Sequence, residues 1–244
     1  MSYEYEAMNH LSPIVVDCET APLLNAREFI DAPDVDDIEA PKNYVKPEAI
    51  AEYIAREKAK RMADYEFDCT NKAALDFNVA RVVALGWWSA EHSDGRFACC
   101  EDEAAERDTL KLFWQLSRQR TIVGFRIREF DLPLMVQRSR YLGIDAPTLD
   151  FGRYARGSRI VDLYDLLTFQ DMRQESVMRR TVKSFARRFG IPVTDTIDGS
   201  HIPELVAAGQ WDLVADHVLS DVRLELALAR RLGVVQPAPV EAVL

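Results

Sequence analysis

Apolar and polar residues follow one another in blocks that predict an α/β protein. Five short runs are rich in β-branched and other apolar residues, as is typical of strands, and they cover residues 13–16, 79–89, 96–100, 121–124 and 158–163. Apolar residues with helical spacing predict helices over residues 102–119, 130–141, 164–172, 182–189, 202–208 and 211–232. Three strands in succession, then alternating helices and strands, predict a mixed five-stranded sheet flanked by helices.

Two connections between these elements are distinctive. Residues 91–95 end in Gly95 and predict the turn of a hairpin between the second and third strands. Residues 22–75 contain no strand pattern, because prolines interrupt an acidic loop and a charged helix is predicted over residues 47–65. We therefore expect residues 1–244 to form a single domain that carries an insertion at residues 22–75.

The composition agrees with a folded protein that acts away from membranes. The chain has 244 residues, of which 48% are hydrophobic and 29% charged, so a large core is expected and disorder is excluded. No apolar run approaches the roughly 20 residues of a membrane helix, and the first residues lack a basic secretion leader, so we expect a cytoplasmic protein. The 4 cysteines and 4 histidines lack zinc-ligand spacing, which argues against a structural zinc site.

Charge is unevenly distributed along the chain. The net charge is −10, which argues against a protein coated by nucleic acid. Residues 118–189, however, contain 15 Lys or Arg against 8 Asp or Glu, a local charge of +7. A polyanion can therefore be held on one face while the rest of the surface repels it.

A pair of carboxylates, Asp17 and Glu19, ends the first predicted strand. Side chains two residues apart on a strand project from the same face, so both point in one direction. Two such acids repel each other unless a cation lies between them, and hard oxygen ligands suit Mg²⁺ or Mn²⁺. A strand that runs into an exposed acidic loop explains the same pattern.

A third carboxylate, Asp131, lies where a helix is predicted to begin after a strand that ends at Gly124. A helix N-cap, with Pro133 in the first turn, also accounts for an Asp at this position. Asp162 and Asp165 follow another strand, but an Asp-Leu pair there is typical of a helix start. We leave these two out of the candidate metal site.

His217 and Asp221 lie four residues apart in the last predicted helix, so the imidazole and the carboxylate share one helical face. A solvent-exposed pair of this kind is common by itself.

Taken together, these elements match an ordered pattern. From residue 14 to about residue 232, apart from the insertion, the sequence resembles the DEDD superfamily of 3′-to-5′ exonucleases, which have a ribonuclease-H-like fold and include the proofreading domains of DNA polymerases. The segment 181–191, which ends in Gly-Ile, is similar to the helix that precedes the last motif of the family. The resemblance implies that four carboxylates hold two divalent cations, Mg²⁺ or Mn²⁺, and these carboxylates are Asp17, Glu19, Asp131 and Asp221.

The last motif departs from both branches of the family. One branch has Tyr-x-x-x-Asp and the other His-x-x-x-x-Asp, whereas His217 and Asp221 combine a His with the spacing of the Tyr branch. We expect His217 to orient or deprotonate the attacking water, because an imidazole changes its protonation state near neutral pH. A helix-surface histidine without a catalytic role is the alternative.

The resemblance also suggests residues that contact the substrate. Thr20 and Phe130 adjoin predicted metal ligands. We expect Thr20 to form a hydrogen bond with the terminal nucleotide and Phe130 to stack on it. Packing in the core explains Phe130 equally well. Arg126 stands where the family commonly has Asn, which changes the contacts at that position. Lys183 belongs to a group of basic residues that either follows the phosphates of a strand or forms a solvated helical face.

The expected function is metal-dependent 3′-to-5′ exonuclease activity on single-stranded or frayed nucleic acid, with DNA favoured over RNA. An inactive ribonuclease-H-like module that binds nucleic acid is the alternative. The insertion begins directly after Glu19, so we expect a helical arm beside the substrate entrance; a solvated decoration or an oligomer contact is equally compatible with its sequence.

Overall fold

The structure, a computed structural model, describes residues 11–152, 159–169 and 180–236. It consists of two compact units. The sheet unit comprises the described residues of Met1–Glu19 and Val82–Leu244, and the small unit comprises Thr20–Arg81. The chain passes from one unit to the other within two of its strands.

Five strands form the mixed sheet expected from the sequence. They are β1 (Leu11–Pro22), β2 (Ala80–Ser89), β3 (His92–Cys99), β4 (Arg120–Gly124) and β5 (Ile160–Asp162), in the order β3-β2-β1-β4-β5. β4 runs parallel to both β1 and β5, while β2 and β3 are antiparallel. The carboxyl ends of β1, β4 and β5 therefore meet at one edge of the sheet, which is where ligands bind in many α/β proteins.

The hairpin between β2 and β3 has a tighter turn than the sequence suggested. β3 already begins at His92, so Gly95 lies inside the strand and not in the turn. The register shifts between the pairs Trp87↔Arg96 and Ser89↔His92, which leaves extra residues on β3. Gly95 has a φ of 77°, in the left-handed region that glycine adopts readily in bulges as well as in turns. The sequence alone therefore does not distinguish a bulge from a turn at this position.

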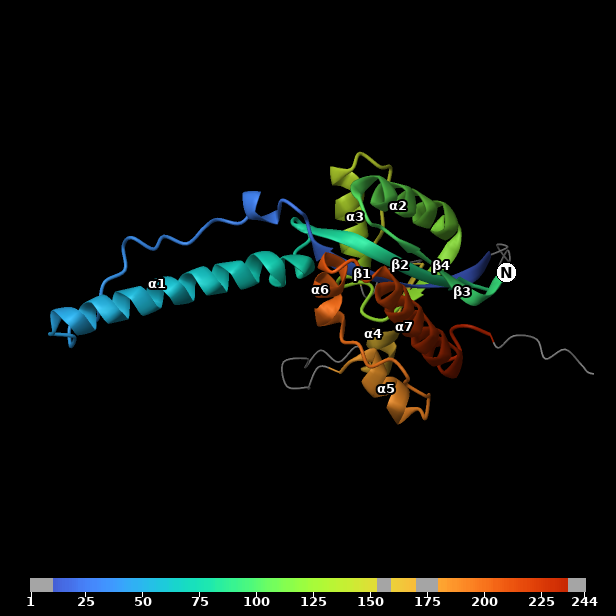
Figure 1. The fold of residues 1–244 in the computed structure, drawn as a ribbon. Coiled ribbons are helices and arrows are strands. Elements are labelled where there is room, and N and C mark those ends of the chain that lie inside the picture. The colour runs from blue at the N-terminus through green and yellow to red at the C-terminus, as the bar shows by residue number, and fades with distance from the viewer. Residues whose placement is uncertain (1–10, 153–158, 170–179, 237–244) are drawn as a thin grey trace, which may run out of the picture. The chain divides into compact units, whose positions relative to one another are not determined.

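Helices cover both faces of the sheet. They are α2 (Glu103–Ser117), α3 (Asp131–Tyr141), α4 (Leu163–Leu167), α5 (Val182–Arg188), α6 (Ile202–Ala207) and α7 (Trp211–Arg231), with a short 3-10 turn η4 (Gly199–His201) before α6. Within the sheet unit, α2 and α3 lie on one side of the sheet and α7 on the other (Figure 1). The end of the predicted helix 164–172 and the first residue of the predicted strand 158–163 lie outside the described residues.

Helix α7 packs closely against the sheet because β2 carries a glycine there. A Cβ at Gly86 would lie 2.9 Å from Cγ2 of Val222 and 3.0 Å from Cγ2 of Val218. The helix thus approaches the strand backbone directly, and its apolar face joins a core that includes Val15, Val123, Leu163, Val222 and Leu228. This close packing fixes the position of the polar residues that α7 presents to the sheet.

The small unit contains the end of β1, a 3-10 turn η1 (Ala26–Glu28), the helix α1 (Pro47–Thr70), a second turn η2 (Lys72–Leu75) and the start of β2. Its core is small and centres on Ala26, Ala73 and Val79. Only Cys69 is buried among the 24 residues of α1. The helix is longer than the predicted range of residues 47–65.

Among the described residues, none of the helices combines the length and the hydropathy that a membrane-spanning helix needs.

Candidate metal centre

Asp17 and Glu19 both lie on β1, which continues beyond Glu19. Glu19 is 9% exposed, and Asp17 is partly buried. The charge that raises the pKa of Asp17 most is that of Glu225, and the corresponding charge for Glu19 is that of Asp221. Asp17 and Glu19 are two residues apart on a strand, and Asp221 and Glu225 are four residues apart on a helix. Both spacings correspond to about 6 to 7 Å. The two acids of β1 therefore have the same separation as the two acids of α7.

Asp131 reaches the same edge of the sheet from the first turn of α3. Its Oδ1 accepts hydrogen bonds from the backbone N of Cys18 at 3.3 Å and from the Sγ of Cys18 at 3.2 Å. The side chain is therefore directed at β1. Phe130 occupies the N-cap position, without a side-chain capping bond. Asp131 is the first residue of the helix, so the alternative interpretation of Asp131 as the N-cap is wrong.

A glycine allows the segment before α3 to run beside β1. A Cβ at Gly124 would lie 2.6 Å from Cδ1 of Ile127 and 2.8 Å from the carbonyl O of Val16. Any other residue would force the chain away from β1. The glycine thus contributes to the position of Asp131 although it has no side chain.

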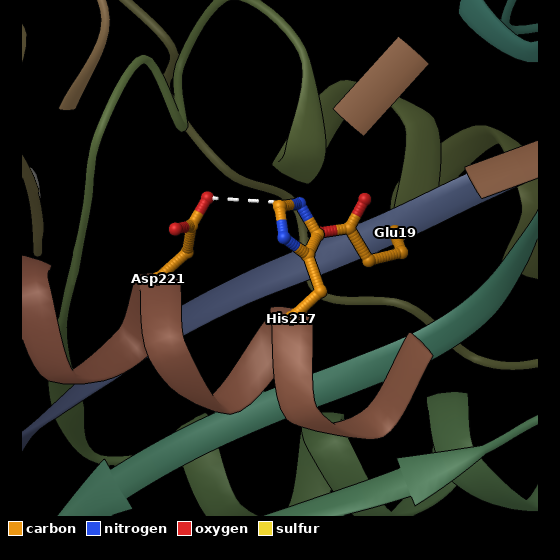
Figure 2. Close-up of side chains that lie close together, drawn as sticks. All are labelled: Glu19, His217 and Asp221. Atoms are coloured by element: carbon orange, nitrogen blue, oxygen red, sulfur yellow. Dashed lines mark ion pairs between the residues drawn. The ribbon is translucent and has the colours of Figure 1, made fainter. Parts of the chain in front are cut away.

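Helix α7 contributes His217 and Asp221 to the site. The Nε2 atom of His217 lies 3.3 Å from Oε1 of Glu19 and 4.0 Å from Oδ2 of Asp221. Figure 2 shows both side chains rising from one helix toward Glu19 on the strand. Each of the three residues offers a ligand atom, and these atoms lie within 4.8 Å of one another. His217 is only 2% exposed, so the interpretation as a helix-surface histidine is wrong.

Burial dominates the electrostatics of the site. It raises the pKa of Asp17 and Glu19 well above the ordinary range, and neighbouring carboxylates raise it further. Burial also raises the pKa of Asp131 to about 6, although the hydrogen bonds from Cys18 oppose this shift. The pKa of Asp221 is raised for the same main reason, and the charge of His217 partly offsets it. Grouped buried acids without a counterion favour either protons or cations.

Glu225, one turn beyond Asp221 in α7, is a fifth acid that the sequence analysis missed. It is 1% exposed, and its Oε1 accepts a hydrogen bond from the backbone N of Phe125 at 3.2 Å. Burial and the charges of Asp131 and Asp221 raise its pKa well above the ordinary range. Glu225 lies three residues after Val222, among the apolar positions of α7. An acid at such a position indicates a buried carboxylate, and this signal could have identified Glu225.

Two buried carboxylate oxygens, Oδ1 of Asp221 and Oε2 of Glu225, have no hydrogen-bond partner among the described residues. No Lys or Arg of this described set forms an ion pair with the five acids Asp17, Glu19, Asp131, Asp221 and Glu225. Unpaired buried oxygens are costly unless a ligand satisfies them. A set of hard oxygen donors in this state fits Mg²⁺ or Mn²⁺.

Asp195 is a second residue that the sequence analysis missed. It lies in the loop between α5 and η4, and its Oδ2 lies 2.6 Å from Nδ1 of His217 and 2.8 Å from Nζ of Lys183. Burial raises the pKa of Asp195, but the hydrogen bonds from Lys183 and from the backbone N of Ile197 outweigh this effect and the net shift is downward. No sequence periodicity connects a loop residue to a helix 22 positions away.

The candidate substrate residues lie in different environments. Thr20 belongs to the small unit, where its Oγ1 donates a hydrogen bond to the carbonyl O of Ala74 at 2.7 Å. Phe130 is half-buried at the start of α3. Lys183 donates to Asp195 and to the carbonyl O of Ile197.

Arg126 has an unusual backbone conformation. Its φ is 59°, in the left-handed region that Asn adopts more readily than Arg. The backbone N donates to Oδ1 of Asp162 at 3.0 Å, and the guanidinium lies 4.2 Å from the ring centroid of Tyr164. Asp162 also caps α4 through the backbone N of Tyr164. These contacts stabilise the strained residue beside the candidate site.

The mixed five-stranded sheet with flanking helices is a ribonuclease-H-like α/β fold. Residues 74–226 match the family described as predicted 3′-5′ exonuclease related to the exonuclease domain of PolB, and the chain belongs to this family. The matched region includes Asp131, His217 and Asp221 and begins after β1. The resemblance to the exonuclease superfamily is thus confirmed.

A solved structure has the same fold. It is the family B DNA polymerase from the hyperthermophilic archaeon Pyrobaculum calidifontis, with 18% sequence identity and a TM-score of 0.56. The similarity covers 91% of this chain but only 24% of the polymerase, so the chain spans about a quarter of its length. No curated protein matches the sequence.

Proposed function

We propose that this protein is a metal-dependent 3′-to-5′ exonuclease that hydrolyses single-stranded or frayed DNA ends by a two-metal mechanism. The observation that carries the proposal is the group of acids from β1, α3 and α7, which form no ion pair with a Lys or Arg among the described residues and keep buried oxygens without a hydrogen-bond partner. Such a group is costly for the fold unless divalent ions bind there. The cytoplasmic location expected from the sequence stays a prediction.

Asp17, Glu19, Asp131 and Asp221 would hold the two ions. Bound Mg²⁺ or Mn²⁺ supplies a nucleophilic water at neutral pH and neutralises charge on the attacked phosphate and on the leaving oxygen. The carboxylates of Asp17 and Glu19 approach from the strand, while that of Asp221 approaches from α7. Residues of β1, α3 and α7 would thus together supply the oxygen ligands of the ions.

His217 would accept the proton of the attacking water at Nε2. This nitrogen faces Glu19 and Asp221, whereas Nδ1 is already bonded to Asp195. Burial of the ring excludes bulk water from competing for the same nitrogen. A general base in this position contributes about 10²- to 10⁴-fold to a rate.

The substrate is proposed to be DNA, in part because the related structure is a DNA polymerase. Thr20 and Phe130 would contact the terminal nucleotide, and Arg126 and Lys183 would contact phosphate. For Lys183 this requires that its Nζ keep a free donor beside its bonds to Asp195 and Ile197. An ammonium group has three donors, so one remains.

Digestion of end-labelled oligonucleotides tests the proposal. Single-stranded DNA, duplex DNA with a mismatched 3′ end and single-stranded RNA would each be incubated with Mg²⁺ or Mn²⁺. The expected result is stepwise shortening from the 3′ end, fastest for single-stranded and mismatched DNA, and absent in EDTA. Asp221→Asn should be inactive, while the control Asp216→Asn, which changes an exposed acid of the same helix, should match the wild type.

Binding of the oligonucleotide without shortening in either metal would instead support an inactive nucleic-acid-binding module. Faster digestion of RNA would leave the chemistry in place and change the substrate.

A further inference from the structure

The imidazole of His217 is held from the side opposite the metal centre. Its Nδ1 lies 2.6 Å from Oδ2 of Asp195, and its Nε2 lies 3.3 Å from Oε1 of Glu19. The ring is 2% exposed. Its two nitrogens therefore have different roles, one toward a loop and the other toward the candidate metal ligands.

Asp195 is itself held in place by two further contacts. Its Oδ1 accepts the backbone N–H of Ile197 at 2.9 Å, and its Oδ2 accepts a hydrogen bond from Nζ of Lys183 at 2.8 Å. Lys183 also donates to the carbonyl O of Ile197. The loop is thus joined at two points to one lysine of α5. The carboxylate cannot turn away from His217 without breaking both contacts.

These contacts determine where the imidazole carries its proton. An ionised carboxylate has no hydrogen to donate, and the ion pair with Lys183 favours the ionised form of Asp195. A bond of 2.6 Å between Oδ2 and Nδ1 therefore requires the hydrogen on Nδ1. In a neutral imidazole the lone pair is then on Nε2, the nitrogen that faces Glu19 and Asp221.

We propose that Asp195 is a positioning residue of the site, which holds His217 in the Nδ1–H tautomer and directs the Nε2 lone pair toward the metal centre, while Lys183 anchors Asp195. The inference rests on the proposed exonuclease function. It assigns Lys183 a second role, inside the protein, beside the phosphate contact proposed above. Orienting partners of this kind typically contribute about 10- to 100-fold to activity.

Asp195→Asn is the direct test, because an amide can donate to Nδ1 and so favour the opposite tautomer. Side-chain ¹⁵N NMR of His217 would be recorded with saturating Mg²⁺, and it reports which ring nitrogen carries hydrogen. The wild type should show hydrogen on Nδ1, and the variant should show hydrogen on Nε2. With Mg²⁺ and oligonucleotide, kcat should fall about 10- to 100-fold while KM stays nearly constant.

Asp198→Asn is the matched control. Asp198 lies in the same loop and carries the same charge, but its Oδ1 accepts hydrogen bonds from Ser200 alone. This variant should retain both the tautomer and kcat of the wild type.

The inference is overturned if wild-type His217 carries its hydrogen on Nε2, a measurement that needs no variant to fold. It is also overturned if Asp195→Asn leaves the tautomer and kcat unchanged. Failure of the proposed function looks different: the wild type would digest no oligonucleotide with either metal, whatever tautomer the spectrum shows.

Discussion

Two groups of buried acids in the sheet unit differ in how their charge is satisfied. Glu106 of α2 is fully buried, and both of its carboxylate oxygens accept hydrogen bonds from Arg138 of α3, at 2.8 and 2.7 Å. The backbone N of Val82 donates to the same carboxylate at 2.8 Å. At the edge of the sheet, Asp221 and Glu225 each keep a buried oxygen without a partner among the described residues.

The difference separates a structural acid from a functional one. A buried carboxylate with a bidentate Arg and a backbone donor is satisfied by the fold, and it connects α2, α3 and β2. A group of buried acids without counterions destabilises the fold, and it persists only where something else makes use of it. Satisfaction of charge, more than burial, therefore distinguishes the candidate metal centre from the core.

The largest expected effect concerns the acids without counterions. Asp17→Asn and Asp221→Asn should each reduce exonuclease activity by more than about 10⁴-fold, because a ligand of the catalytic ions is lost. In EDTA the same variants should be at least as stable as the wild type, since one repelling charge is removed. Oligonucleotide digestion and thermal unfolding measure the two effects. A variant that retains activity would remove that residue from the metal centre.

His217→Ala should reduce kcat by about 10²- to 10⁴-fold, as expected for loss of a general base. His217→Tyr should restore part of this loss, because the spacing to Asp221 is that of the Tyr branch of the superfamily. Single-turnover digestion with saturating Mg²⁺ isolates the chemical step. Equal rates in the wild type and the Ala variant would show that the buried imidazole is only structural.

The satisfied acid should behave in the opposite way. Arg138→Met leaves Glu106 buried without a counterion and should lower the free energy of unfolding by about 3–5 kcal/mol. Adding Glu106→Gln should recover much of this loss, because the amide oxygen still accepts from Val82. Urea denaturation measures both values. The activity per folded molecule should stay at the wild-type level, in contrast to the variants of Asp17 and Asp221.

The same contrast shows what the sequence can predict. The mixed five-stranded sheet follows from the succession of predicted strands and helices, and Asp17, Asp131 and Asp221 stand in recognisable motifs. The partner of a buried acid is not encoded locally: Glu106 and Arg138 lie 32 positions apart, and Asp195 and His217 lie 22 apart. Only the tertiary structure shows that Glu106 pairs with Arg138 in the core and that Asp195 contacts the imidazole of His217.

Local patterns also mislead where the backbone is irregular. Gly95 has the sequence context of a turn, but the bulge in β3 places it inside the strand. The charged pattern of α1 gave the correct start at Pro47 but an early end, because a helix with little burial has no apolar stripe to mark its limit.

The pH dependence of stability provides a smaller and more specific test. Burial raises the pKa of Asp131 from 3.8 to about 6, so the folded protein holds this proton more tightly than the unfolded chain. The stabilisation is present below pH 3.8 and is lost as the pH rises through about 6. In EDTA, Asp131→Asn avoids this loss, and its stability relative to the wild type should increase between these pH values by up to about 3 kcal/mol.

The matched control is Asp108→Asn, which removes the same charge from the exposed face of α2. Chemical denaturation at several pH values gives both curves. A flat curve for Asp131→Asn would mean that this carboxylate is ionised in the folded protein despite its burial.

The smallest expected effect concerns the small unit, which has five basic residues able to meet phosphate: Lys42, Lys46, Lys58, Lys60 and Arg61. Lys58 pairs with Asp36 at 3.2 Å and Arg61 donates to the carbonyl O of Asp34 at 2.8 Å, so these two are already engaged. The triple variant Lys42→Glu, Lys46→Glu and Lys60→Glu therefore tests the arm with the other three.

If the small unit guides a strand toward the site, this triple variant should raise KM about 3- to 10-fold for long oligonucleotides and less for short ones, because only a long strand reaches additional cations. The effect should shrink at high salt, since charges are then screened and the release of each counterion contributes less free energy to binding. Lys111→Glu on α2 shows the effect of one such charge reversal outside the small unit, a third of the change in the triple variant. Equal changes of KM for long and short substrates would assign the helix α1 to a role other than guidance, because a general loss of charge does not depend on the length of the strand.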